Sequence, residues 1–600
     1  MDRLGNVYVT VTAGPSLRAP FAAVLVEWQA HQVPDFPVAG LEARLREFLP
    51  APVATRLPLP LATAGFETVA AAIASALQDV NGANGFGLRS WRDGRGRCAI
   101  AMGYADPAVT AVAVQAGLDL ATAFFDGMAG KLLNGDELTR RLQAVVNQMQ
   151  LRQPDGLMRS LIRAASRQRI PVLPVAPASR VWQFGQGSRG IHFFEAASER
   201  DAMTGTRLAR SKLFSNQLIT ALGLPGVRHR TVSTADEARR VAGEMGYPVV
   251  VKPVQGGKGK GVTAGIVDAA GIAPAFEVAR AADAGAVLVE KHIAGDDHRL
   301  VALGGKFAWA VRRSPARVRG DGVHSIETLV ATENQQRNAS VARELGVVPI
   351  KLDTEAQSLL AAQGLSPVSV PAAGAEITLG RVANISRGGV LTDCTDTIHP
   401  DNRALAEVLA RAFRLDAIGI DFLTPDITRS WREVACGVLE VNSTPGFSSD
   451  ERAARVVRAR FPADSPDGRI PTVVLVSDPA SIDAVATAIR ASSAESATGV
   501  ATADTATLAG LDRHHQGTDL SARIRALLLD KGCQALVVGA TQGQLADSGF
   551  PLDRCSLAVI LGQGLLNAEL RRLVDACADR VATAADVSEA VALTQQAIHA

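Results

Sequence analysis

Residues 249–262 read VVVKPVQGGKGKGV, and the rest of the chain is interpreted outward from them. Three valines run into Lys252, and a segment with four glycines and two further lysines follows. β-Branched residues favour a strand, and glycines let backbone N–H groups approach an anion closely. Lysine supplies point charges that suit phosphate. The stretch therefore predicts a buried strand that delivers one ammonium group, followed by a cationic loop over a phosphate-bearing ligand.

A second strand is predicted where residues 438–442 read VLEVN. Glu440 and Asn442 are two positions apart and so share one face of that strand. Asp421, in the segment AIGIDF, is another carboxylate on an apolar strand. Buried carboxylates are costly unless they are paired or bind a metal, and hard oxygen ligands beside a triphosphate indicate Mg²⁺. These three residues are the predicted metal ligands, and ATP is the predicted nucleotide.

Two lysine features have ordinary interpretations beside the functional one. Lys212 would add a second ammonium group for the phosphates, although alone it is typical of a solvated surface lysine. The loop with Lys258, Gly259, Lys260 and Gly261 would close over the phosphates, or it is a flexible hairpin, because a lone glycine-rich loop is weak evidence. It is not a Walker A motif, since no Lys-Ser or Lys-Thr follows its last glycine.

Residues 287–293 read VLVEKHI and predict a strand whose end forms an adenine pocket. The backbone of the strand end, at Glu290 and Lys291, would read the base edge. Ile293 would cover the face of the base, and Asp297 would accept from the ribose hydroxyls. The alternative is an edge strand with a solvated tail. Arg313 would stabilise the transferred phosphate. The alternative is that either Arg312 or Arg313 faces solvent instead.

Composition narrows the class of protein. A chain of 600 residues is expected to hold several domains, and a formal net charge of +2 without a long basic block disfavours nucleic acid as a partner. The start lacks a signal-peptide pattern, and no uninterrupted apolar run approaches the roughly 18–20 residues that span a bilayer. Six scattered cysteines without a CxxC pair indicate reduced thiols in the cytoplasm and disfavour zinc.

The chain divides into three predicted domains. Segments QLRQPDG (150–156) and DSPDG (464–468) are typical of linkers, so the boundaries are 1–155, 156–465 and 466–600. The first domain is a small α/β unit with a helix over Phe66–Val80 and Asp136 as the N-cap of a later helix. In the third, strands over 472–476, 535–538 and 557–561 alternate with helices, which predicts a parallel, Rossmann-like sheet.

Longer motifs point to one family. Residues 383–389 read ANISRGG, residues 396–402 read DTIHPDN, and residues 440–447 read EVNSTPGF. With the lysine strand, the Glu-Lys segment and the Asp and Glu-x-Asn strands, this pattern resembles the cyanophycin synthetases, which are ATP-grasp carboxylate–amine ligases. The resemblance is strong over about residues 160–450 and fainter on both sides. It implies an α/β multidomain protein with a central ATP-grasp fold.

The resemblance also implies a chemistry and a set of site residues. The family's ATP-grasp domain phosphorylates the C-terminal carboxylate of a polyaspartate backbone that bears arginine, and an amine then attacks the acyl phosphate. By this resemblance Ser386, Arg387 and Gly388 lie near the acceptor carboxylate, and Lys260 and Arg313 assist transfer. The residues implied to hold ATP are Lys212, Lys252, Lys258, Gly259, Gly261, Glu290, Lys291, Ile293 and Asp297. The implied partners are a polymer primer, a small peptide or amino acid, and further copies of the chain in a homo-oligomer such as a dimer.

Two departures from the family pattern shape the expectation. Where the two-site synthetase has a Gly-x-x-Gly-Lys-Thr phosphate loop in a Mur-ligase-like domain, this chain reads SDPASID over 477–483, which implies a truncated, inactive domain. A one-site enzyme resembles the shorter synthetase that polymerises β-aspartyl-arginine dipeptides. Where the family often has His-x-x-x-His, Thr68 and Ala72 stand here, so polymer trimming is not expected, although polymer binding is.

Two alternatives stay open. One is an ATP-grasp ligase that joins a different amino acid or dipeptide, because the loop and metal motifs address ATP rather than the amine. The other is a non-catalytic homologue that binds polymer or a partner enzyme.

Overall fold

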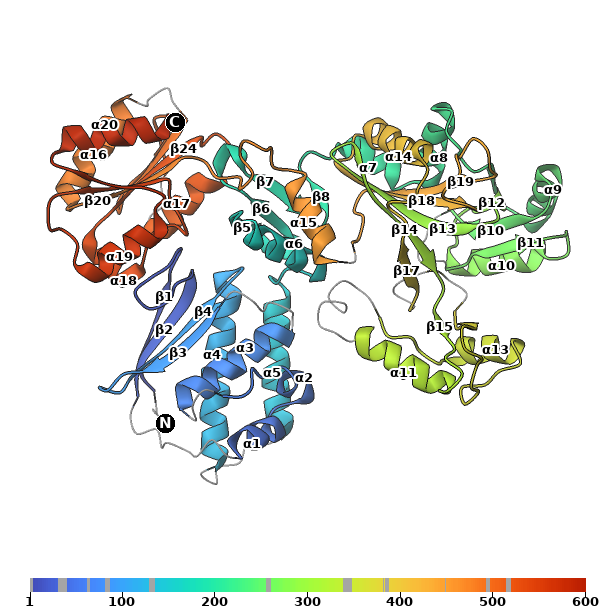
Figure 1. The fold of residues 1–600 in the computed structure, drawn as a ribbon, viewed down its shortest axis with the longest axis horizontal. Helices are drawn as coiled ribbons and strands as arrows, with labels where there is room; N and C mark the ends of the chain where they lie inside the picture. The colour runs from blue at the N-terminus through green and yellow to red at the C-terminus, as the bar shows by residue number, and fades with distance from the viewer. Residues whose placement is uncertain are drawn as a thin grey trace. The chain divides into compact units, whose positions relative to one another are not determined.

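The computed structural model describes residues 4–30, 40–61, 65–80, 87–128, 135–254, 260–337, 348–380, 383, 388–447, 449–492, 497–513 and 519–599. Contacts divide the chain into two units: residues 1–193 with 461–600, and residues 194–460 (Figure 1). The segment 156–193, which the sequence analysis placed in the central domain, is thus grouped with the two terminal segments. The three-domain division itself stays a prediction.

The first unit opens with an antiparallel sheet and its covering helices. The strand order is β1 (Leu4–Val11), β2 (Ala23–Ala30), β4 (Arg97–Gly103), β3 (Leu88–Arg92). Buried side chains of α3 (Phe66–Val80) and α4 (Pro107–Met128) form one core with this sheet, beside the short helices α1 (Leu41–Phe48) and α2 (Ala51–Ala54). The predicted helix over Phe66–Val80 is confirmed.

Two details of this region differ from expectation. α5 (Gly135–Gln150) includes Asp136 in its first turn, so the prediction of Asp136 as its N-cap is wrong. α4 is long and apolar enough to cross a membrane by length and composition alone, although no such run was expected. Because 61% of that apolar window is buried inside the fold, it has the character of a core helix.

α6 (Gly156–Arg167) leads into a small antiparallel sheet of the first unit. Asp155 caps it by accepting from the Met158 backbone N–H at 2.9 Å. β5 (Val172–Ala176) then pairs with β6 (Val181–Phe184), which is followed by β7 (Ile191–Phe194).

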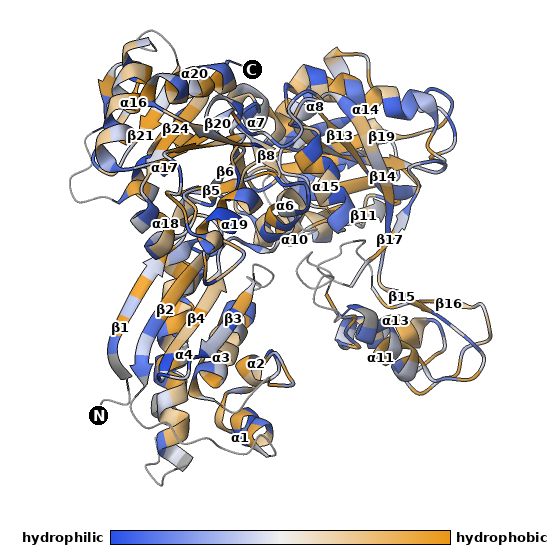
Figure 2. Cartoon of the chain, turned by 60° about the vertical axis from the view of Figure 1, so that its left-hand side comes forward, coloured by the Kyte–Doolittle hydropathy of each residue, from blue (hydrophilic) through white to orange (hydrophobic). Residues whose placement is uncertain are grey.

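The C-terminal part of the first unit is a sheet in the order β23-β22-β21-β24-β20-β25-β26. β20 (Thr472–Val476), β21 (Thr498–Ala501), β24 (Ala535–Ala540), β25 (Leu557–Leu561) and β26 (Val581–Ala584) are parallel, which confirms the predicted parallel arrangement. β22 (Ala506–Leu508) and β23 (Leu511–Asp512) add antiparallel strands at one edge. Figure 2 shows these strands as largely hydrophobic.

Alternate residues of these strands face opposite helical layers. Val473 and Leu475 pack with α16 (Pro479–Ser492) and α20 (Val587–Ile598). Val474 and Val476 pack with the helices of the other face. Those helices are α17 (Leu520–Leu529), α18 (Gln542–Ser548) and α19 (Ala568–Cys577). A sheet covered on both faces explains why its strands read as continuous apolar runs.

The second unit has two larger antiparallel sheets and one small one. The first sheet has the order β11-β10-β12-β9 and packs against α9 and α10. The second has the order β17-β14-β13-β18-β19, and its core includes residues of α8 and α14. Their bounds are β9 (His229–Val232), β10 (Val249–Pro253), β11 (Thr263–Ile266), β12 (Val287–Lys291), β13 (Asp296–Leu303), β14 (Lys306–Ser314), β17 (Val390–Asp393), β18 (Ala417–Thr424), β19 (Gly437–Asn442), α8 (Lys212–Ala221), α9 (Ala235–Met245), α10 (Ile272–Ala282) and α14 (Pro400–Phe413).

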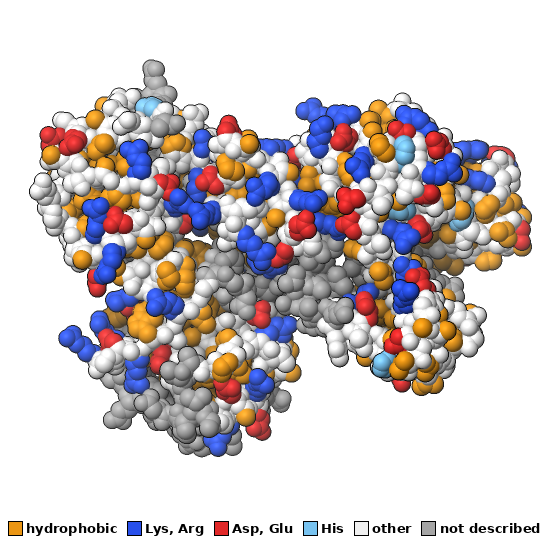
Figure 3. Space-filling model, viewed as in Figure 1, with side chains coloured by type: hydrophobic (Ala, Val, Ile, Leu, Met, Phe, Trp, Pro, Cys, Tyr) orange, Lys and Arg blue, Asp and Glu red, His pale blue; other side chains and the backbone are white. Residues whose placement is uncertain are grey.

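A smaller cluster within the second unit joins β15 (Arg317–Arg319) and β16 (Glu376–Thr378) to α11 (Ile326–Arg337) and α13 (Thr354–Ala362). On the face drawn in Figure 3, basic and acidic side chains of the described residues are interspersed, in keeping with the net charge of +2. The six cysteines carry free thiols.

Candidate active site

A cavity of about 620 Å³ in the second unit brings together side chains of both large sheets. β10 and β12 contribute from the first sheet, and β13, β14, β18 and β19 contribute from the second. The predicted residues that line it are Lys212, Lys252, Lys260, Glu290, Lys291, Ile293, Asp297, Arg313, Asp421, Glu440 and Asn442. Residues predicted from separate segments for nucleotide and metal binding therefore share one space.

The wall from the first sheet carries a buried ion pair. β10 and β12 run antiparallel, with Val250 opposite Glu290 and Lys252 opposite Leu288. The Lys252 ammonium lies 2.6 Å from Glu290 Oε2, and both residues are at least nine-tenths buried. Because each charge would be costly to bury alone, Glu290 fixes the position of the Lys252 ammonium inside the cavity.

The end of β12 is held by its own contacts. The Lys291 ammonium donates to the carbonyl oxygens of Gly246 at 2.9 Å and Tyr247 at 3.1 Å. Ile293 packs on Gly437, where an added Cβ would lie 2.4 Å from the Ile293 Cδ1 atom. A glycine at position 437 is therefore what lets the isoleucine reach the cavity.

The carboxylates of the second sheet face each other. Asp421 of β18 is directly opposite Glu440 of β19, and Gly419 is opposite Asn442. Burial raises the pKa of Glu440, and the neighbouring Asp421 carboxylate raises it further, against the influence of Lys212. A buried carboxyl group beside a like charge needs a nearby cation to stay ionised.

Two arginines approach the same carboxylate. Arg313 lies 3.0 Å from Asp421 Oδ2 and 2.7 Å from Asp297 Oδ1. Arg299 lies 2.7 Å from Asp421 Oδ1. Burial raises the pKa of Asp297, which the adjacent Arg313 opposes. The two guanidinium groups thus face the carboxylates of Asp421 and Asp297 at this end of the cavity.

Arg299 is the site residue that sequence reasoning missed. It lies two positions after Asp297 on β13, so both side chains point to the same face of the strand. This two-residue alternation could have identified Arg299 from the sequence. The intervening His298, which was assigned no role, is only 2% exposed and lies on the opposite face.

The remaining predicted residues are outside the cavity or outside the described chain. Lys258, Gly259, Ser386 and Arg387 fall outside the described residues. Gly261 has a φ of +71° and packs against Pro253 and Ala282. Gly388 is not among the lining residues, and its carbonyl accepts from Arg337 Nη1 at 3.0 Å. Their proposed roles stay predictions.

The donor set fits a hard cation. Within the described chain no group of three or more His, Cys, Asp or Glu side chains is placed to hold a metal ion, and the predicted set is two carboxylates and one amide. Asn442 Nδ2 is buried without a hydrogen-bond partner among the described atoms. Glu440 and Asp421 would supply charge and Asn442 an amide oxygen, which are ligands that Mg²⁺ accepts. A cation there would share Asp421 with Arg299 and Arg313.

The C-terminal sheet has a different strand end. β20 ends at Val476, and only Ser477 and Asp478 separate it from α16. Asp478 accepts from the Ser481 backbone N–H at 3.1 Å and from its hydroxyl at 2.7 Å. Ser477 donates to the Leu561 carbonyl at 3.0 Å. A carboxylate thus occupies the helix start, where phosphate loops place backbone N–H groups for an anion.

Comparison with known proteins finds relatives of part of this chain. The family described as carbamoyl-phosphate synthase L chain, ATP binding domain, matches residues 211–300. The cyanophycin synthetase of Crocosphaera subtropica is 32% identical over 327 residues, which are 53% of this chain and 37% of that protein. The enzyme of Synechocystis is 30% identical over the same shares. Over about half of its length, this chain is therefore similar to cyanophycin synthetases. It spans a little over a third of the length of these curated cyanophycin synthetases, and its second unit has an ATP-grasp fold.

Solved structures resemble the chain more distantly. A bifunctional glutathione synthetase from Pasteurella multocida covers 60% of this chain and 52% of its own, with 21% identity and a TM-score of 0.43. A D-alanine–D-alanine ligase from Bacillus anthracis covers 44% and 69%, with 14% identity and a TM-score of 0.27.

Proposed function

We propose that this chain is an ATP-dependent carboxylate–amine ligase that extends a cyanophycin-like polymer by β-aspartyl-arginine dipeptides. One observation carries the proposal: ammonium groups, a strand-end pocket and paired carboxylates that were predicted separately line one cavity. The similarity to cyanophycin synthetases supports the polymer as the substrate class.

The proposed nucleotide contacts follow from the walls of the cavity. Lys252, fixed by Glu290, and Lys212 would hold phosphates, while the end of β12 with Ile293 would hold the adenine. Burial lowers the pKa of Lys212, so a phosphate nearby would favour its charged form. Asp297 already binds Arg313, and ribose hydroxyls would share that carboxylate.

Catalysis would rest on alignment and charge rather than on a covalent nucleophile. Mg²⁺ at Asp421, Glu440 and Asn442 would neutralise the triphosphate when bound. Arg313 and Arg299, held by Asp421, would stabilise negative charge as the terminal phosphoryl group moves to the polymer carboxylate. The amine of the incoming dipeptide would then displace phosphate from the acyl phosphate.

The dipeptide is proposed because one ATP site supports one ligation for each building block. The Asp478 carboxylate at the start of α16 supports the interpretation that the C-terminal sheet does not bind a second ATP. The homo-oligomer and the cytoplasmic location implied by the resemblance stay predictions.

A second candidate is a ligase that forms a different amide. A bifunctional glutathione biosynthesis protein from Mannheimia succiniciproducens is 34% identical over 210 residues, 33% of this chain and 27% of that protein. Its identity is similar to that of the cyanophycin synthetases, so the ATP-binding region leaves the amine open. The non-catalytic alternative is disfavoured, because a decayed homologue would have lost residues needed to bind ATP and metal. Those that the structure describes are all of the required type.

The test supplies the purified chain with ATP, Mg²⁺ and a short cyanophycin primer. One reaction receives β-aspartyl-arginine, and the other receives free aspartate and arginine. ADP release with primer growth in whole dipeptide steps, in the first reaction alone, is the expected result. Primer growth from the free amino acids would contradict the single-site proposal. No ADP release in either reaction would favour the second candidate or the non-catalytic homologue.

A further inference from the structure

A second cavity lies in the first unit, where three segments distant in the sequence meet. Its volume is about 530 Å³, and it is lined from the N-terminal sheet, from the α6–β5 segment and from α17. All its lining residues belong to residues 1–193 or 461–600, whereas those of the candidate active site belong to the other unit. It is therefore a separate cavity, of a size that small organic ligands fill.

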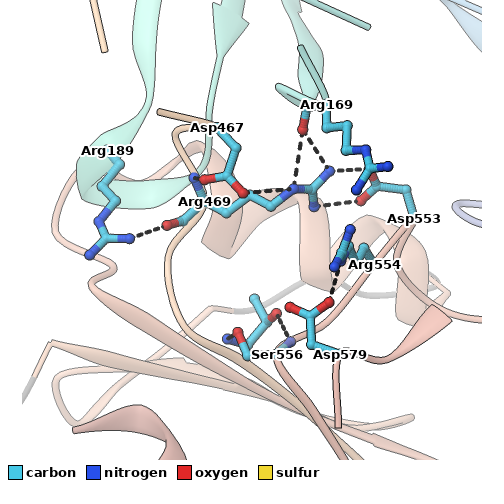
Figure 4. A network of polar contacts seen from close by, with 9 residues as sticks. Arg169, Arg189, Asp467, Arg469, Asp553, Arg554, Ser556 and Asp579 are labelled. Atoms are coloured by element: carbon cyan, nitrogen blue, oxygen red, sulfur yellow. Dashed lines mark hydrogen bonds and ion pairs between the residues drawn. The ribbon is translucent and has the colours of Figure 1, made fainter. Parts of the chain in front are cut away.

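Direct contacts hold the three walls together. The Phe550 backbone N–H donates to the Pro15 carbonyl at 2.8 Å, and a Cβ added at Gly14 would lie 1.9 Å from the Leu552 carbonyl oxygen. At another side, Arg469 forms a bidentate ion pair with Asp553 and donates to the Arg169 carbonyl (Figure 4). All of these contacts are made between protein atoms. The cavity is therefore formed by the fold of this unit itself.

One lining side chain has an unused buried acceptor. Gln186 is 1% exposed, and its Oε1 atom has no hydrogen-bond partner in the described part of the chain. A buried carbonyl oxygen left without a donor is unfavourable. A ligand with an N–H or O–H group in the cavity would satisfy it.

The charges of the wall favour an anion. Of the two acidic lining residues, Asp553 is neutralised by Arg469, and Asp519 caps α17 by accepting from the Ala522 N–H at 2.8 Å. Arg169 and Arg525 also line the cavity, and neither has an ion pair among the described residues. Arg525 donates to the Pro174 carbonyl and keeps other N–H groups. The cavity thus has two guanidinium groups and one carboxylate, that of Asp519, outside the ion pairs of the described residues, so the positive charge is in excess.

Most of the remaining wall is apolar, and Tyr104, Ser166 and Ser521 are its other polar side chains. Each of the three segments contributes apolar side chains, for example Val11, Ile170 and Ile524. We propose that this cavity binds a small organic anion with an apolar body and one hydrogen-bond donor. The anionic group pairs with Arg169 or Arg525, the donor bonds Gln186 Oε1, and the apolar body fills the remaining space.

The first test uses 8-anilinonaphthalene-1-sulfonate, which combines an aromatic body, a sulfonate and one N–H, with the purified full chain. Its fluorescence is expected to rise in a saturable, one-site titration. Gln186→Leu removes the acceptor, and Ala22→Trp fills the cavity from the N-terminal sheet, so each is expected to weaken binding by about tenfold or more. Arg523→Met, on α17 but not lining the cavity, is the matched control and is expected to bind like the wild type.

Two further measurements separate a ligand contact from a structural role. Without probe, Gln186→Leu is expected to melt at the same temperature as the wild type or higher, because a buried acceptor without a partner is removed. N-acetyl-phenylalanine is expected to displace the probe, and its uncharged amide is not. Non-saturable fluorescence, equal binding by Gln186→Leu, or equal displacement by acid and amide would overturn the proposal.

Discussion

The ends of β10 and β20 differ although both strands are valine-rich and buried. The second-last residue of β10 is Lys252, whose ammonium is fixed by Glu290 inside a cavity. β20 is followed by Ser477 and Asp478, whose side chains bind the neighbouring strand β25 and the first turn of α16. The comparison teaches that apolar residues determine where a strand lies, while one or two polar residues after it decide whether the strand end can take a phosphate.

The largest effect is expected from a substitution in the candidate active site, among its predicted metal ligands. Glu440→Gln keeps the shape of the side chain and removes the charge proposed for Mg²⁺. ADP release in the dipeptide assay is expected to fall by more than about 100-fold, because even outer-shell partners of metal ligands contribute up to that much. Glu433→Gln, in a solvent-exposed pair with Arg429, is the matched control. Unchanged turnover in Glu440→Gln would refute the metal assignment.

A smaller loss of activity is expected at Lys252, with a distinctive effect on stability. Lys252→Met leaves the Glu290 carboxylate buried without its cation, which is expected to cost about 3–5 kcal/mol in the free energy of unfolding. Lys252→Met with Glu290→Gln removes both charges and should recover much of that stability, while ATP binding stays weak. Chemical denaturation and nucleotide titration of both variants measure the two effects. Recovery of ATP binding in the double variant would contradict the role of the ammonium.

Arg299 is expected to influence the metal through Asp421. Arg299→Gln frees one carboxylate oxygen, so half-maximal activity should need less Mg²⁺, while kcat falls by about 10–100-fold. Arg299→Lys, which keeps a positive charge, should recover part of kcat. An unchanged Mg²⁺ requirement with a lower melting temperature would indicate a purely structural arginine.

The smallest effect is expected at the end of β20. Asp478→Ala removes a carboxylate that accepts from the start of α16, and such losses cost about 0.5–2 kcal/mol of stability. ADP release per folded molecule should not change. A loss of activity comparable with that of Lys252→Met would mean that the C-terminal sheet takes part in the reaction, and the comparison of the two strand ends would fail.

Local patterns predicted much of this fold. The runs over 472–476 and 557–561 are strands with those bounds, and Phe66–Val80 is a helix, because β-branched runs and alanine-rich periodicity are local properties. The grouping of residues 156–193 with the chain ends was not predictable. It rests on contacts such as those of Gln186 with Gly468 and Ser188 with Cys533, which local sequence does not encode.

The same limit applies to the candidate site. Lys252, Glu290 and Asp421 each carried a local signal, a polar residue on an apolar strand, and the structure brings them to one cavity. Arg299 was passed over because its partner Asp421 is distant in the sequence, and an arginine on a strand is usually solvated. The pairing across β13 and β18 supplied that information.

The second unit begins and ends at one place, since Arg460 Nη2 donates to the Ala196 carbonyl at 3.3 Å. It is an insertion into the first unit, whose parallel strands follow it in the chain. During translation the inserted unit can fold as soon as it leaves the ribosome. Residues 1–193 must wait longer for the surface that completes them, so in this interval the nascent chain is expected to depend most on chaperones.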